Sequence, residues 1–319
     1  SQSQGSITLK IIPAIKEEDR LRDSKVYMRA LFDYTPLEDK ATPCQEAGLP
    51  FKRGDILQVV TQDDPTWWQA KRVGDNNLRA GLIPSKQFQE RVSQGQAVLG
   101  VLPQHSGLRR SFRLSRKDRQ ESSGEGSELG ESDFLTYEEV TRYQHRSNER
   151  PRLVVLIGSL GARINELKQR VIAENPHRYA VAVPRKFIEH GEYKENQYGT
   201  SIEAIRSVQA KNKMCIVDVQ PEALKRLRTA EFKPYVIFVK PRIPESRRRR
   251  SAATSPGGGE HGRLTEMRQS AVQIDQQYGH LVDCVLIKED SAGACAELRG
   301  ILERLERDSF WVPLIWVRT

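Results

Sequence analysis

The second half of the chain alternates short apolar runs with stretches of helical periodicity. The apolar run Arg152–Ile157 has the length and composition of a buried parallel strand, and apolar residues recur at helical spacing over Asn165–Asn175. Similar alternation continues over Tyr179–Leu305. Strands that alternate with helices in this way predict βαβ units on a parallel sheet, and therefore an α/β fold for this half.

The turn between that first strand and its helix has the position of a nucleotide-binding P-loop without its chemistry. A working loop reads G-x-x-x-x-G-K-[ST], in which backbone N–H groups and the lysine bind phosphate and the hydroxyl binds magnesium. With Gly158 aligned to the first glycine, Arg163 replaces the second, Ile164 the lysine and Asn165 the hydroxyl residue. Gly161 is the other glycine that remains. These changes disfavour phosphoryl transfer. The alternative to a degenerate P-loop is an ordinary strand-to-helix turn that has two glycines.

Four segments of the first half resemble, in order, the landmarks of a Src-homology-3 (SH3) domain. They are Ala30–Tyr34, Phe51–Leu57, Trp67–Trp68 and Ala80–Pro84. The resemblance implies a groove for polyproline helices, formed by Phe32, Tyr34, Trp67 and Pro84. Phe32 replaces the usual first tyrosine, and the tyrosine expected shortly after Ser85 is missing. A purely structural role for this aromatic cluster is the alternative.

Three segments of the second half resemble guanylate kinases. They are Lys186–Ser201, Cys215–Val219 and Pro234–Pro241. Together with the SH3-like half, they resemble the membrane-associated guanylate kinase (MAGUK) scaffolds, specifically their membrane palmitoylated protein subfamily. The resemblance implies a multidomain fold, in which an all-β SH3 barrel is split and completed by the C-terminal strand. The other domain is a guanylate-kinase-like α/β domain with a P-loop-type parallel sheet.

In the split SH3 domain that the resemblance implies, two strands flank the kinase-like domain and pair with each other. Phe134–Val140 and Phe310–Val317 match these two strands by position. The second run carries two tryptophans, and leaving so much apolar surface in water is costly, so we expect the run to be buried on a sheet.

The resemblance also implies a surface that contacts a guanine nucleotide or, in scaffold members, a partner peptide. Its residues are Glu189, Tyr193, Tyr198, Gly199, Thr200, Ser201 and Asp218. From the residues alone, Tyr198 and Gly199 also suit a turn before a helix, with Thr200 or Ser201 as its N-cap. Asp218 suits a structural hydrogen bond equally well.

One departure from the family follows Pro184. Guanylate kinases insert a lobe with phosphate-binding arginines there, before the segment that begins at Phe187. Here only Arg185 and Lys186 separate Pro184 from Phe187. The residues leave open whether the lobe is deleted or only missing from this sequence. The predicted segments are residues 1–25 (last strand of a PDZ domain and linker), 26–91 (SH3 domain), 92–133 (flexible basic hook), 134–140 (SH3 strand), 150–309 (guanylate-kinase-like domain) and 310–319 (final SH3 strand).

The predicted hook is rich in Ser, Gly, Gln and charge, which indicates a flexible segment. Leu108 and Phe112 are spaced for one helical face among six basic side chains. The basic residues are Arg109, Arg110, Arg113, Arg116, Lys117 and Arg119. Basic amphipathic segments bind calmodulin or acidic lipid, and a solvated tether is the alternative.

Composition narrows the function classes. The net charge of +9 over 319 residues is compatible with nucleic-acid binding, but the basic residues gather in the hook and at Arg247–Arg250, and no reading element is recognisable, so we expect no nucleic-acid partner. The six histidines lack ligand spacing, so we expect no metal site. We also expect no cofactor. No run reaches the ~20 apolar residues of a transmembrane helix.

The resemblance implies a catalytically inactive scaffold at the cytoplasmic face of the plasma membrane and at cell junctions. Its partners would be adaptor peptides and the cytosolic tails of transmembrane polarity or adhesion proteins, Crumbs-like by resemblance. Ile164 and Asn165 disfavour the main alternative, an active guanylate kinase that converts ATP and GMP into ADP and GDP. A third hypothesis makes the hook a calmodulin-regulated switch.

Overall fold

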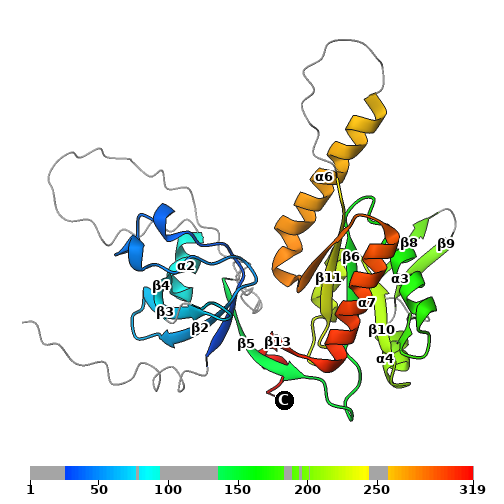
Figure 1. Cartoon of the computed structure of the whole chain (residues 1–319), viewed down its shortest axis with the longest axis horizontal. Helices are drawn as coiled ribbons and strands as arrows, with labels where there is room; N and C mark the ends of the chain where they lie inside the picture. The colour runs from blue at the N-terminus through cyan, green and yellow to red at the C-terminus, as the bar shows by residue number, and fades with distance from the viewer. Residues whose placement is uncertain are drawn as a thin grey trace, which may run out of the picture. The chain divides into compact units, whose positions relative to one another are not determined.

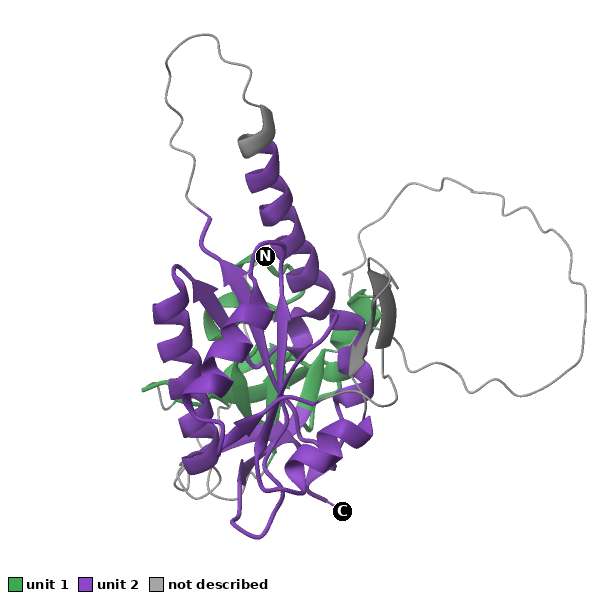
Figure 2. Ribbon diagram, turned by 90° about the vertical axis from the view of Figure 1, so that its right-hand side faces the viewer, with its two compact units in different colours: residues 1–138 green, residues 139–319 purple. Residues whose placement is uncertain are grey.

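The chain forms two compact units, residues 1–138 and 139–319, which Figure 2 shows in different colours. The computed structural model describes residues 26–76, 79–93, 136–182, 189–193, 196–200, 202–243 and 258–318, with the backbone alone within 189–200 and at 258–261. The first unit is an antiparallel β fold and the second an α/β fold, so the predicted fold class is confirmed.

The first unit is built from antiparallel strands around a small apolar core. Its elements are β1 (Tyr27–Ala30), the 3₁₀ turns Pro36–Glu38 and Gln45–Ala47, β2 (Ile56–Thr61), β3 (Trp67–Arg72), β4 (Gly81–Pro84) and α2 (Lys86–Ser93) (Figure 1). β1 pairs with β2, β2 with β3, and β3 with β4. β5 (Tyr137–Gln144) begins in this unit, where Tyr137 joins the core and donates its hydroxyl hydrogen bond to the Pro84 carbonyl oxygen at 2.9 Å.

The second unit is a five-stranded parallel sheet in the order β12-β11-β6-β10-β7. The strands are β6 (Val154–Gly158), β7 (Tyr179–Ala180), β10 (Met214–Asp218), β11 (Tyr235–Pro241) and β12 (Cys284–Lys288). The helices are α3 (Ile164–Glu174), α4 (Ile202–Gln209), α5 (Leu224–Leu227), α6 (Gly258–Tyr278) and α7 (Ser291–Arg307), with 3₁₀ turns at Pro221–Ala223 and Gly279–Leu281. A separate antiparallel hairpin joins β8 (Glu189–Tyr193) to β9 (Asn196–Thr200).

Helices cover both faces of this sheet. Side chains alternate between the two faces along each strand, and the central strand β6 places apolar side chains on both. Val154 and Leu156 of β6 pack in the cluster that contains α3 and α7. Val155 and Ile157 pack in the cluster that contains α4, α5 and the end of α6. β6 is therefore buried on both sides at the centre of the sheet, and the turn that follows Gly158 lies at the carboxyl edge of the central strand.

The second part of β5 belongs to the second unit, where Val140–Gln144 pairs antiparallel with β13 (Ser309–Pro313). This is the strand pairing expected for a split SH3 domain. The Phe310 ring lies edge-on to the Tyr235 ring at 5.5 Å between centroids, so β13 also packs against β11 of the parallel sheet.

The strand predicted at Phe310–Val317 is wrong in its second half. The chain turns into a 3₁₀ helix at Leu314–Trp316, because Pro313 has no N–H with which to extend the ladder. Trp316 is buried as expected, whereas Ile315 is 73% exposed. The other predicted strand also shifts: β5 runs to Gln144, and Phe134 and Leu135 lie outside the described residues.

Candidate functional site

The turn between β6 and α3 is the first candidate site, because it lies where a P-loop binds phosphate. It has the left-handed backbone that such a turn needs, with φ of 86° at Gly161 and 48° at Arg163. Arg163 is the N-cap residue of α3, and its side chain makes no capping hydrogen bond. The strand, turn and helix predicted from the sequence are therefore present.

Three N–H groups of this turn already donate to protein atoms. The Ser159 N–H donates to the Val239 carbonyl oxygen at 3.3 Å and the Ala162 N–H to the Ser159 carbonyl oxygen at 3.0 Å. The Leu160 N–H donates to the hydroxyl oxygen of Ser270, on α6, at 3.0 Å. A phosphate-binding turn works because its N–H groups point together at the ligand. Here these donors are used by the fold itself.

The two glycines of the turn make room for protein side chains. A Cβ atom added at Gly161 would lie 2.6 Å from the methyl carbon of Met267, which also comes from α6. A Cβ atom added at Gly158 would lie 2.8 Å from Cγ2 of Ile164, the residue at the lysine position of the motif. Both distances are too short for a real Cβ contact. A side chain at Gly158 would displace the branched Ile164, whereas one at Gly161 would displace only the flexible end of Met267.

Two lysines near the turn are held by the protein. Lys168, one helical turn after Ile164 on α3, is only 5% exposed and pairs with the carboxylate of Asp218 at the carboxyl end of β10. Lys288, at the end of β12, donates to the Ala162 carbonyl oxygen at 3.3 Å. Asp218 therefore has the structural partner that one reading of the sequence predicted. Both ammonium groups therefore bind protein oxygen atoms at the carboxyl edge of the sheet.

The predicted peptide surface falls mainly on the β8–β9 hairpin. In its register Glu189 lies opposite Thr200, and Gly191 lies opposite Tyr198. Because cross-strand partners and alternate residues share a face, Glu189, Tyr193, Tyr198 and Thr200 fall on one face of the hairpin. Gly199, opposite His190, falls on the other. Asp218 belongs to the parallel sheet instead, and Ser201 lies outside the described residues.

Two family models match the chain, one within each unit. The guanylate kinase family matches residues 184–305, and the variant SH3 domain family matches residues 27–91. MAGUK p55 subfamily member 3 of Homo sapiens is 54% identical over 384 residues, which include 100% of this chain and 65% of that protein. The chain belongs to the MAGUK p55 family. Member 7 of Xenopus tropicalis is 47% identical over 371 residues, with 100% of this chain and 64% of that protein covered.

This MAGUK p55 chain spans only part of the length of its relatives. It spans 65% of the length of the human relative. Both aligned lengths exceed the 319 residues of this chain, so each relative has residues in the aligned region without a counterpart here. The joint after Pro184, where the sequence predicts a missing lobe, lies outside the described residues, and the missing lobe stays a prediction.

A solved structure of the SH3-kinase fragment of tight junction protein 3, in apo-form, is also similar. It is 19% identical, with 89% of this chain and 98% of that chain covered and a TM-score of 0.39.

The four predicted SH3 groove residues of this MAGUK p55 chain all contact the core of the first unit. The Tyr34 hydroxyl shares a hydrogen bond with Thr42 Oγ1 at 2.8 Å, and burial raises the pKa of Tyr34 to about 12. The Phe32 ring lies 5.3 Å from that of Tyr137, whose hydroxyl donates to Pro84.

Trp67 packs against Phe88, a contact that the sequence does not predict. Its ring lies 5.4 Å from the ring of Phe88, a residue of α2 that is buried. Ser85 fixes the start of α2, because its hydroxyl oxygen accepts from the Phe88 N–H at 3.1 Å. The aromatic cluster thus has the structural role that the sequence left open, and polyproline binding stays a prediction.

Two further observations concern only the residues that the structure describes. Among the described residues, no helix is long and apolar enough to cross a membrane, and no group of three or more His, Cys, Asp or Glu residues is arranged to hold a metal ion. The basic residues of the hook, Arg109 to Arg119, and the PDZ-like segment 1–25 lie outside the described residues.

Proposed function

We propose that this chain is a catalytically inactive, guanylate-kinase-like scaffold. The observation that carries the proposal is the filling of the P-loop-like turn by α6, whose Ser270 accepts the Leu160 N–H and whose Met267 packs on Gly161. Ile164 adds an aliphatic side chain where phosphoryl transfer needs a cation. Since such transfer depends almost wholly on positioning and charge stabilisation, the turn lacks the groups that would accelerate it.

The binding function assigned to the guanylate-kinase-like unit rests on the β8–β9 hairpin. The guanylate kinase match includes this hairpin but begins after the turn of Gly158. One face of the hairpin gathers a carboxylate residue, two tyrosines and a threonine, namely Glu189, Tyr193, Tyr198 and Thr200. Tyrosines with nearby hydrogen-bonding groups are typical anchors of protein interfaces. This face supports recognition of a partner peptide.

The partners proposed are cytosolic tails of transmembrane polarity or adhesion proteins, of the Crumbs type, and adaptor peptides. Their location would be the cytoplasmic face of the plasma membrane and cell junctions. The basic hook, Arg109 to Arg119, would add a contact with calmodulin or acidic lipid, since its charge suits both. Family membership supports the scaffold role.

A phosphotransfer assay tests the inactivity. The full chain is mixed with ATP, magnesium and GMP, and ADP is measured against a blank without protein. We expect no ADP above the blank. The double variant Ile164→Lys/Asn165→Ser, which rewrites two motif positions, should stay at background because Met267 and Ser270 still fill the turn. Turnover of about 1 s⁻¹ or faster, the low end of ordinary kinase rates, would contradict the proposal.

A peptide titration tests the binding face. A synthetic Crumbs-type cytosolic-tail peptide is titrated against the chain and against Tyr198→Ala, which should weaken binding at least tenfold. His190→Ala is the matched control, because His190 lies on the opposite face of the same hairpin. If Tyr198→Ala and His190→Ala bind the peptide equally well, this hairpin face is not the docking surface.

A further inference from the structure

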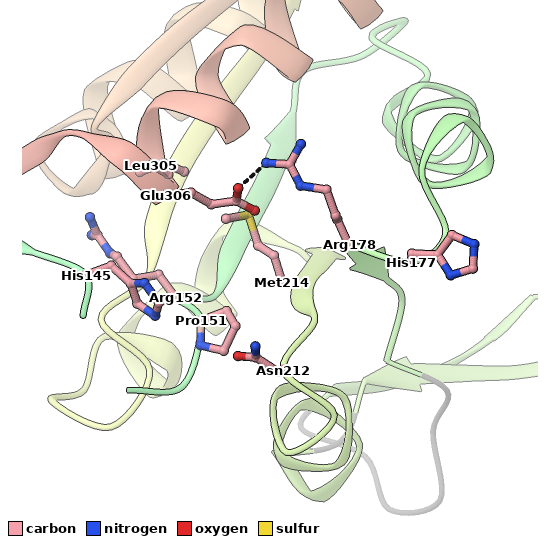
Figure 3. A pocket seen from close by; sticks show the side chains of 9 residues that line it. All are labelled: His145, Pro151, Arg152, His177, Arg178, Asn212, Met214, Leu305 and Glu306. Carbon is pink, nitrogen blue, oxygen red and sulfur yellow. Dashed lines mark hydrogen bonds and ion pairs between the residues drawn. The ribbon is translucent and has the colours of Figure 1, made fainter. Parts of the chain in front are cut away.

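The second unit contains a pocket at the edge of the sheet opposite to the P-loop-like turn. Its volume is about 330 Å³, and Figure 3 shows the side chains that line it. Arg152 precedes β6, Arg178 immediately precedes β7, and Met214 is the first residue of β10. The pocket therefore lies at the amino ends of three parallel strands, whereas the turn of Gly158 lies at the carboxyl end of β6. We call it the basal pocket. Its lining residues belong neither to the P-loop-like turn nor to the β8–β9 hairpin.

The side chains of the basal pocket carry more positive than negative charge. Arg152 is buried, where its guanidinium donates to the carbonyl oxygens of Lys233 and Pro234 at 2.7 and 3.3 Å. Arg178 is the second guanidinium and Glu306 the carboxylate that lines the pocket. His145 and His177 are the remaining titratable groups of the lining. The balance of these side chains favours an anionic ligand over a cationic one.

Arg178 and Glu306 pair across the pocket, as the dashed line in Figure 3 shows. Their side chains are 39% and 36% exposed, and Glu306 lies in the last turn of α7. Exposed ion pairs contribute little to stability, because water and salt compete with them. A ligand carboxylate can therefore take the guanidinium of Arg178 while Glu306 returns to water.

Apolar side chains line the same pocket beside these charges. Met214 is 3% exposed and Leu305 is 2% exposed, and both belong to the apolar cluster beneath α7. Pro151 adds a third apolar surface. Ligand pockets in proteins typically combine such apolar walls with a few polar groups that fix the orientation of the ligand. Since Met214 and Leu305 expose little surface, a matching ligand has an anionic head and only a small apolar body.

We propose that the basal pocket binds a small organic carboxylate with an apolar body. The carboxylate would bind the planar fork of the Arg178 guanidinium through two parallel hydrogen bonds, the geometry in which arginine recognises carboxylates. The body would lie beside the half-buried Pro151 and would reach Met214 and Leu305 only at their small exposed areas. Free aliphatic or aromatic acids offer this chemistry, and so does the C-terminal residue of a peptide.

Methyl NMR provides a direct test, because the chain has three methionines, Met28, Met214 and Met267. The full chain, labelled at the methionine methyl groups, is titrated with benzoate, with its neutral analogue benzamide and with its cationic analogue benzamidine. We expect benzoate to shift the Met214 signal saturably and to bind most tightly, with Met28 and Met267 unchanged. No saturable shift of Met214, or a preference for benzamidine, would overturn the proposal.

Substitutions test the sign of the charge. Arg178→Ala should weaken benzoate binding at least tenfold, and Arg178→Lys should weaken it less, because it keeps the charge without the fork. Glu306→Gln should strengthen binding several-fold, since it removes the competing carboxylate. Glu297→Gln, on an exposed position of the same helix, is the matched control and should change nothing. Weaker binding by Glu306→Gln would show a cation site and overturn the proposal.

The source of the carboxylate is tested in a separate arm. An acetylated tripeptide that ends in a free leucine carboxylate is compared with its C-terminal amide and with hexanoate. Binding of the free-acid peptide or of hexanoate supports the pocket and shows which source it prefers. Equal binding of the peptide amide and the peptide acid would contradict recognition of a carboxylate.

Discussion

The hydroxyl oxygen of Ser270 accepts the N–H hydrogen bond of Leu160 at 3.0 Å, across 110 positions of the sequence. Leu160 lies in the turn that follows β6, at the place where a P-loop presents its N–H groups to phosphate. Met267, almost one helical turn before Ser270 on α6, packs on Gly161 of the same turn. α6 thus supplies one hydrogen-bond acceptor and one apolar side chain to the turn.

Ser270→Ala should destabilise the second unit by about 1 kcal/mol, because the Leu160 N–H loses its acceptor. Urea denaturation followed by circular dichroism measures the loss. Ser207→Ala is the control, since the Ser207 hydroxyl donates only to the Glu203 carbonyl oxygen of its own helix. An unfolding free energy equal to that of the parent chain would show that this contact contributes nothing to the turn.

Gly161→Ala should be more destabilising than Gly74→Ala. Both glycines have left-handed backbone, with φ of 86° and 88°, and each substitution costs about 1 kcal/mol for that reason. A Cβ atom at Gly74 meets nothing within 4 Å, whereas one at Gly161 meets Met267. The excess cost should vanish when Gly161→Ala is made in a Met267→Ala background, which a double-mutant cycle measures. An excess that persists there would place the strain elsewhere.

Lys168→Met should destabilise the second unit by about 2 kcal/mol, because the Asp218 carboxylate loses its ammonium partner. The cost stays below the ~3–5 kcal/mol of a fully buried pair, since the Asp218 side chain is partly exposed. Lys168→Met/Asp218→Asn should recover much of the loss, because no unpaired charge remains. Thermal and urea denaturation measure both variants. If the double variant is less stable than Lys168→Met, the ion pair is not the source of the effect.

A chain that ends at Asp308 should lose several kcal/mol of stability, because it lacks β13. β5 then loses β13 as its partner over Val140–Gln144, and Tyr235 loses its ring contact with Phe310. A chain that ends at Val317 is the control and keeps the strand pair intact. Denaturation of the two chains compares them, and identical midpoints would show that the β5–β13 pair carries little stability.

The sequence predicts local structure well in this chain, and it predicts long-range packing poorly. Strand, turn and helix around Gly158 follow from apolar periodicity and two glycines. The strand predicted over Phe310–Val317 is an exception, because the strand-stop signal of Pro313 outweighs the apolar pattern there. The alternation predicted over Tyr179–Leu305 includes the apolar pattern of Arg263–Tyr278, which covers most of α6. That pattern does not show that Met267 and Ser270 meet the turn after β6, because periodicity gives a face of a helix and not its distant partner.

The basal pocket was unforeseen for the same reason. Arg178 precedes β7, and Glu306 lies in the last turn of α7, which is 128 positions further along the chain. Only the parallel sheet brings the amino ends of its strands beside the end of that helix. The Lys168–Asp218 pair is similar, since 50 positions separate its members.

Titration of the methionine-labelled chain with ATP and magnesium reports on the turn itself, because Met267 packs on Gly161. We expect the Met267 methyl signal to stay in place up to millimolar nucleotide, like those of Met28 and Met214, and no ADP to form. A saturable shift of the Met267 signal, with ADP released, would show that phosphate enters the turn and that the chain is an active kinase.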